Sequence, residues 1–128
     1  MTGVRGLAHA NLRAPEAMIE RLRCFYIDIV GLRQGPRPGF RSRGYWLYAG
    51  DTDVLHLSIA GPGDAAPQPT GAFNHLAFAC TDLAATRARL DAAGLAYEVD
   101  VVDTLGQVQL FLTDHCGLAI ELNFAHAP

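Results

Sequence analysis

The chain has 128 residues, half of them apolar, which is enough to bury one hydrophobic core in a single compact domain. Thirteen acidic against ten basic residues give a net charge of −3, which excludes a broad phosphate-binding surface and favours a small molecule over nucleic acid as the partner. No segment approaches the ~20 apolar residues that span a bilayer and the first residues lack a signal-peptide pattern, so we expect a cytoplasmic protein without a membrane partner.

The first half of the chain has the element order of a βαβββ unit. A short strand is expected at residues 6–12, and Pro15 then opens a helix that Gly31 ends. One face of this helix carries four apolar residues, Met18, Leu22, Phe25 and Ile29. Three further strands are expected, at residues 32–34, 44–50 and 53–60.

A stretch rich in Pro and Gly, residues 61–71, is typical of a linker, and the same element order then begins again. The second half predicts a strand at 73–80 and a helix at about 82–93, capped by Thr81 and stopped by Gly94. Three strands follow, at residues 95–102, 107–113 and 118–124. We therefore expect a single α+β domain, residues 1–128, made of two βαβββ modules at about 5–60 and 72–124.

The two halves also place chemically similar residues at matching positions. Aligning them sets His9 opposite His75, 66 residues later, and His56 opposite Glu121, 65 residues later. Sequence identity between the halves is slight, so the internal duplication is inferred from element order and from these spacings.

These four residues share a polar side of their strands. Because side chains alternate along a strand, the apolar rows face one way, and three of the five histidines and one glutamate face the other beside small residues. Neutral imidazoles and a carboxylate converging from separate strands are suitable ligands for a divalent metal. The simpler interpretation, polar residues on the wet face of a sheet, suits any one of them alone, whereas the matched set favours a metal site.

At this point the sequence resembles the vicinal oxygen chelate superfamily, which includes glyoxalase I, extradiol dioxygenases and bleomycin-binding proteins. The residues that carry the resemblance are LAHANL with FYIDIVGL, then DVLHLSIA, NHLAFACTDL and FLTDHCGLAIELNF. The resemblance implies a glyoxalase-like fold, a curved mixed sheet with helices on its outer face. It also implies metal ligands at His9, His56, His75 and Glu121.

Two departures from the family separate the possible reactions. Glyoxalase I enzymes usually have a carboxylate where this chain has His56. Extradiol dioxygenases bind iron through two histidines and a glutamate, and a histidine near position 56 acts as acid and base. Their catalytic tyrosine, ten residues before the glutamate, is replaced here by Phe111.

Three hypotheses remain open. In the first, His9, His75 and Glu121 hold Fe²⁺ or Mn²⁺, and His56 takes a proton from a catechol-like substrate that chelates the metal through vicinal oxygens. In the second, His56 is a fourth ligand to Ni²⁺, Zn²⁺ or Mn²⁺ for isomerase or lyase chemistry, with Glu121 as base. In the third, the protein is a metal-free, drug-binding module similar to bleomycin-resistance proteins. The histidine count favours an enzyme.

Further residues are candidates for the wall of a substrate pocket. They are Asn11, on the same side of its strand as His9, and three aromatic residues: Trp46 and Tyr48 of one strand and Phe111 of another. Core or interface positions would suit the aromatic residues equally well. An arginine-rich loop that includes Arg37 could clamp a carboxylated substrate, although an exposed basic loop is the simpler interpretation. Relatives of this kind commonly dimerise, so we also expect a homodimer whose subunits could share the metal site.

Overall fold

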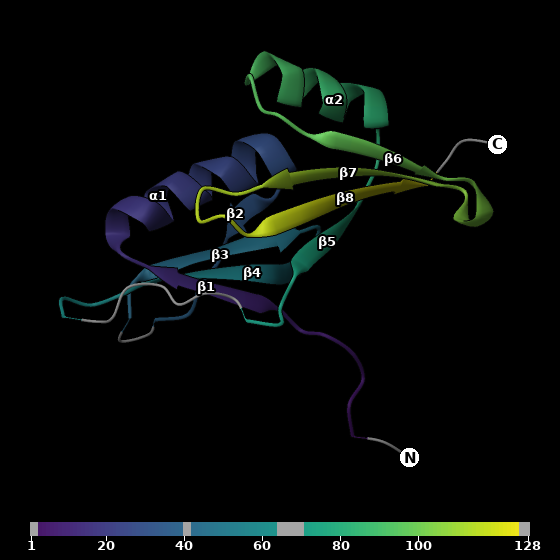
Figure 1. Ribbon diagram of the computed structural model, residues 1–128. Helices are drawn as coiled ribbons and strands as arrows, with labels where there is room; N and C mark the ends of the chain where they lie inside the picture. Colours follow the sequence, from purple (N-terminus) through teal and green to yellow (C-terminus); the bar gives the residue numbers. More distant parts are fainter. Residues whose placement is uncertain (1–2, 40–41, 64–70, 126–128) are drawn as a thin grey trace. The chain divides into compact units, whose positions relative to one another are not determined.

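The computed structural model describes residues 3–39, 42–63 and 71–125. The chain divides into two compact units, Met1–Gln68 and Pro69–Pro128. Each contains one α-helix and a four-stranded mixed sheet (Figure 1), which confirms the α+β class with two βαβββ modules. Most of the predicted linker, residues 64–70, lies outside the described residues. That the modules form one domain with one curved sheet stays a prediction.

The first unit contains four strands and one helix that is extended by a π-helical segment. They are β1 (Ala10–Ala14), α1 (Glu16–Cys24), the π-helix Phe25–Val30, β2 (Arg33–Gly35), β3 (Gly44–Ala49) and β4 (Thr52–Ile59). The spatial order is β1-β4-β3-β2. Strands β1 and β4 are parallel and the other pairs antiparallel, as a crossover through one helix requires.

The helix of the first unit begins and ends where the sequence indicates. The Pro15 carbonyl accepts the first helical hydrogen bond, and Gly31 ends the π-helix with a positive φ of 97° that favours glycine. The buried residues are Ile19, Leu22, Phe25 and Tyr26. Met18 and Ile29 are only half-buried; for Ile29 the reason is that the wider turns of the π-helix rotate it away from 3.6-residue spacing.

The second unit repeats the arrangement. Its elements are β5 (His75–Cys80), α2 (Leu83–Ala92), β6 (Glu98–Val102), the 3₁₀ turn Asp103–Leu105, β7 (Gln107–Thr113) and β8 (Ala119–Ala125), and the strand order is β5-β8-β7-β6. The predicted cap Thr81 is wrong by one residue. The Asp82 carboxylate accepts a hydrogen bond from the Ala85 amide at 3.0 Å, which satisfies a free N–H group of the first turn.

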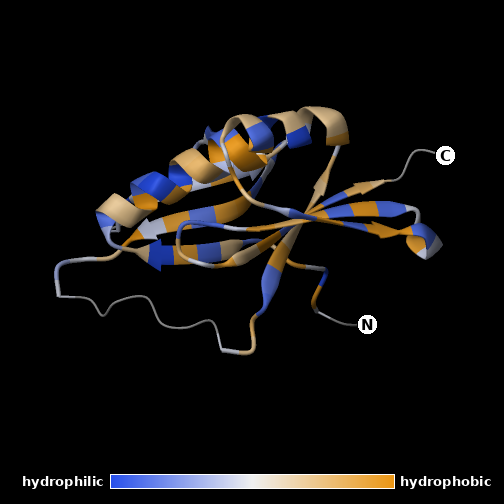
Figure 2. Cartoon of the chain, turned by 45° about the horizontal axis from the view of Figure 1, so that its top comes forward, coloured by the Kyte–Doolittle hydropathy of each residue, from blue (hydrophilic) through white to orange (hydrophobic). Residues whose placement is uncertain are grey.

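Alternation along the strands separates a core face from a polar face in each sheet. Figure 2 shows hydrophobic and hydrophilic residues in alternating bands along the strands. Leu55 and Leu57 of β4 are at most 1% exposed, and Ile120 and Leu122 of β8 are fully buried. The predicted core faces of β4 and β8 are therefore confirmed, and the intervening residues lie on the opposite face of their sheets. Among the described residues, none of the helices is long and apolar enough to cross a membrane.

Candidate functional site

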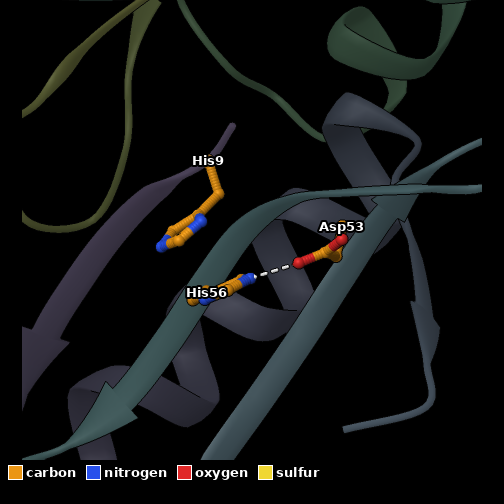
Figure 3. Close-up of side chains that lie close together, drawn as sticks. All are labelled: His9, Asp53 and His56. Carbon is orange, nitrogen blue, oxygen red and sulfur yellow. Dashed lines mark hydrogen bonds and ion pairs between the residues drawn. The ribbon is translucent and has the colours of Figure 1, made fainter. Parts of the chain in front are cut away.

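In the first unit three potential metal ligands lie close together: His9, Asp53 and His56. One nitrogen or oxygen from each lies within 4.8 Å of the others. His9 is exposed just before β1, Asp53 is half-buried near the start of β4, and His56 is 8% exposed in the middle of that strand. Figure 3 shows the His9 ring beside the His56 ring, with Asp53 beyond His56.

The two imidazoles belong to a stack of three aromatic rings. The centroids of His9 and His56 are 3.7 Å apart with 14° between the planes, and Trp46 stacks on His56 at 4.1 Å and 9°. Trp46 stands directly opposite His56 in the β3–β4 register. Since the lone pair of an imidazole nitrogen lies in the ring plane, stacked rings direct their lone pairs side by side. His9, which is exposed, must therefore turn before both rings can bind one ion.

Asp53 fixes the orientation of His56. The two side chains are joined at 2.7 Å between Oδ2 and Nε2, and this hydrogen bond is the main reason why the pKa of Asp53 lies below its ordinary value. With Nε2–H donating to the carboxylate, Nδ1 of His56 is left as the acceptor nitrogen.

Asp53 was missed by the sequence reasoning. Strict alternation from His56 puts a residue three positions earlier on the other face. The register slips between Leu47 and Ala49 of β3, where β4 has one residue more than its partner strand. This bulge reverses the alternation and brings Asp53 round to His56. The one sequence signal was an acidic residue three positions before a candidate histidine.

The second unit brings His75 and Glu121 together. His75 Nε2 lies 3.4 Å from Glu121 Oε1, and His75 Nδ1 donates to the Asn74 side-chain oxygen at 2.8 Å. The other carboxylate oxygen of Glu121 accepts hydrogen bonds from Gln109 at 3.3 Å and Asn123 at 3.1 Å. Oε1 and Nε2 are thus the atoms turned toward each other, while neutral amides hold the far side of both groups.

The two pairs occupy the same place in their sheets. His56 pairs with Asn11, two residues after His9, and Glu121 pairs with Ala77, two residues after His75. Each unit therefore sets its second ligand candidate diagonally across from the first on a parallel strand pair. This equal register supports the duplication inferred from the spacing. Whether all four residues meet at one ion stays a prediction.

A cavity of about 440 Å³ opens beside the ring stack of the first unit. Its lining consists of the three clustered residues and five others, Asn11, Arg37, Ser42, Trp46 and Ser58. Two of the predicted pocket residues, Asn11 and Trp46, thus line a cavity. Within this lining Asn11 donates a hydrogen bond to Ser58 at 2.8 Å.

The other two predicted pocket residues have structural contacts of their own. The Tyr48 hydroxyl donates to the Pro36 carbonyl, and the Arg33 guanidinium lies 5.3 Å from the centre of its ring. Phe111 is half-buried on β7, directly opposite Glu121. Substrate binding by any of the four predicted residues stays a prediction.

The donor types fit a divalent first-row metal. Imidazole nitrogen and carboxylate oxygen are the ligands that Zn²⁺, Fe²⁺, Mn²⁺ and Ni²⁺ share, and second hydrogen bonds to histidine ligands are typical of metal sites. His9, Asp53 and His56 are a possible metal-binding group, and the identity of an ion is open.

Residues 6–122 match the Glyoxalase family, described as the Glyoxalase/Bleomycin resistance protein/Dioxygenase superfamily. The chain belongs to this superfamily. Solved structures of the glyoxalase-like fold agree. A putative glyoxalase family protein from Bacillus anthracis matches with a TM-score of 0.73 and 20% identity, covering 98% of each chain.

Two other structures show how varied the glyoxalase superfamily is. TnmS3, an antibiotic binding protein from Streptomyces sp. CB03234, matches with a TM-score of 0.69 and 24% identity over 98% of this chain and 99% of its own. The fosfomycin resistance protein FosX from Listeria monocytogenes, complexed with Mn(II) and a dihydroxypropylphosphonic acid, matches with a TM-score of 0.68 and 16% identity over 97% and 94%. None of the curated proteins matches this chain.

Proposed function

We propose that this protein is a divalent-metal-dependent enzyme of the glyoxalase or dioxygenase type, acting on a small substrate that offers two vicinal oxygens. One observation carries the proposal. Two histidine-containing pairs, His9 with His56 and His75 with Glu121, occupy the same register position in the two modules. Each pair has a member held by a polar neighbour, as metal ligands and catalytic bases are.

In this proposal His9, His75 and Glu121 hold the ion. A divalent ion bound there would supply Lewis-acid polarisation of the substrate oxygens. Glu121 is suited to a ligand role because Gln109 and Asn123 occupy one of its oxygens and turn the other toward His75.

His56 then acts as acid and base. Its Nε2–H is held by Asp53, which leaves the neutral imidazole to accept a substrate proton at Nδ1, and the nearby carboxylate stabilises the imidazolium that forms. The parallel stack with His9 supports this role over that of a fourth ligand, because the two lone pairs do not converge. An acid–base role for His56 favours dioxygenase-like chemistry over the glyoxalase-like alternative.

Metal content and two substitutions test the proposal. Protein purified without chelator should carry stoichiometric metal, and His75→Ala should lose it, whereas His115→Ala, an exposed histidine in the turn before β8, should not. His56→Ala should keep the metal and lose oxygen uptake on a catechol panel with Fe²⁺. Loss of metal in His56→Ala would make His56 a fourth ligand and favour isomerase or lyase chemistry. A wild-type protein without metal under these conditions would exclude the enzyme altogether.

A metal-free binding protein is the second candidate. The exposed His9 ring at the end of the stack with His56 and Trp46 offers a face on which a flat molecule could lie beside the cavity, and TnmS3, of similar fold, is an antibiotic binding protein. Ligand binding that persists after exhaustive chelation, together with a purified protein that contains no metal, would support this function. The homodimer, with a site that subunits share, and the cytoplasmic location remain part of the proposal. Light scattering on the eluting protein tests the dimer.

A further inference from the structure

Arg37 brings a positive charge to the cavity that contains the candidate catalytic residues. Its side chain is one of those that line the 440 Å³ space with His9, His56 and Trp46. Arg37 is half-buried, and its guanidinium donates to the Ser42 carbonyl at 3.0 Å and to the Ser42 hydroxyl at 3.3 Å. These contacts hold the planar group at the cavity wall.

Neighbouring arginines of the same loop region have other roles. Arg43 forms a bidentate pair with Glu16 at 3.0 and 3.1 Å, and Arg33 donates to the Gly50 carbonyl while lying over the Tyr48 ring. Arg41 lies outside the described residues. Arg37 is therefore the described arginine of this region that the fold delivers to the cavity.

The rest of the lining indicates what the cavity can hold. His56 is sandwiched between Trp46 and His9, so the flat surface that the stack offers is the outer face of the exposed His9 ring. Asn11 and Ser58, already hydrogen-bonded to each other, and the Ser42 hydroxyl offer polar contacts around it. The acidic residue of the lining, Asp53, is engaged with His56. A flat molecule with one anionic group matches a planar wall, polar rim and guanidinium.

We propose that the cavity of the first unit takes a flat substrate bearing a carboxylate, and that Arg37 is the specificity-determining residue that binds this carboxylate. The inference rests on the proposed function, because it names the substrate class of the same site. A guanidinium can bind both carboxylate oxygens at once, which a neutral amide of the same shape cannot match. The enzyme should thus prefer a carboxylated catechol to its uncharged analogue.

The test compares two probes of equal shape, a dihydroxybenzoate and the matching dihydroxybenzamide. Trp46 is the single tryptophan of the chain and stacks on His56, so its fluorescence reports binding in the cavity. Affinities are measured for the wild type, Arg37→Met, Arg37→Lys and the control Arg21→Met, an exposed arginine of α1 outside the lining. Each protein is titrated both with metal and after chelation.

We expect the wild type and Arg21→Met to bind the benzoate at least about tenfold more tightly than the benzamide, as for other hydrogen bonds to charged groups. Arg37→Met should lose this preference and Arg37→Lys should keep part of it. Equal affinities in the wild type, a preference that survives in Arg37→Met, or no binding of either probe would overturn the inference.

The two proposals fail separately in this design. An Arg37-dependent preference in protein that binds no metal would support the inference and count against the enzyme. Metal-dependent turnover of both probes at equal efficiency would keep the enzyme and reject the role of Arg37.

Discussion

Gly44, at the start of β3, is a position where the backbone of the neighbouring strand leaves no room for a side chain. It pairs with Ser58, whose hydroxyl accepts the hydrogen bond from Asn11 at the cavity wall. A Cβ at residue 44 would lie 2.0 Å from the Leu57 carbonyl oxygen and 3.2 Å from the Ser58 Cα. Because both of these atoms belong to the backbone, the two strands must separate to accommodate Gly44→Ala.

The expected cost combines overpacking, typically about 1–3 kcal/mol, with a weakened strand hydrogen bond of about 1 kcal/mol. We therefore expect Gly44→Ala to lower the free energy of unfolding by about 3 kcal/mol. The control is Gly50→Ala, where φ is +59° but the space is open, and where the strain of a left-handed alanine costs about 1 kcal/mol. Urea unfolding followed by Trp46 fluorescence measures both. The reasoning is refuted if Gly44→Ala costs no more than Gly50→Ala.

Two further predictions concern hydrogen-bonded carboxylates. Tyr45 donates to Glu20, which lowers the pKa of Glu20 from 4.5 and raises that of Tyr45 from 10.0. Tyr45→Phe should thus cost about 1 kcal/mol between pH 4.5 and pH 10.0. The difference in urea midpoint from the wild type should shrink as the pH falls from 4.5 through the lowered pKa of Glu20, and again as it rises from 10.0 through the raised pKa of Tyr45. Asp53→Asn should lower oxygen uptake on the catechol panel by about tenfold or more, because it loosens the proposed base His56, while Asp51→Asn in the neighbouring turn should not; equal rates would remove the positioning role.

Element order, faces and turns could be predicted because each depends on local sequence. Period-two alternation identifies the buried side of β4 and β8, and Gly31 and Gly94 end their helices since both need a positive φ. The first strand is the largest error in bounds: it begins at Ala10 instead of residue 6, so His9 precedes it. The parallel partner β4 pairs with β1 only from Leu55 onward. The start of β1 is therefore set by a tertiary contact that the local sequence does not contain.

The polar neighbours of the candidate site depend on features that a single sequence does not contain. Asp53 reaches His56 through a bulge, and a bulge depends on how two strands meet. Arg37 was recognised only as part of a basic loop, because its approach to Ser42 joins two segments of irregular backbone. His56 and His75, by contrast, lie on β4 and β5, and His9 lies just before β1, so their positions follow from local alternation and spacing.

A substitution of Glu121 can distinguish a metal-binding role from a structural role, because the two roles predict opposite effects on the stability of the metal-free protein. Its side chain is only 10% exposed, and its neighbours are the Gln109 and Asn123 amides and the His75 imidazole. Neutral donors offset the desolvation of a carboxylate incompletely, so a residue kept for metal binding should destabilise the metal-free fold.

Glu121→Gln preserves the shape and can still accept both amide hydrogen bonds. In chelator we therefore expect its Tm to rise by about 4 °C, equivalent to about 1 kcal/mol, while the added stability that Zn²⁺ gives the wild type should largely disappear. Glu98→Gln, on exposed β6, should change neither value. A lower Tm for Glu121→Gln in chelator would contradict this proposal. The charge of Glu121 would then stabilise the metal-free fold, and the carboxylate would be a structural hydrogen-bond acceptor.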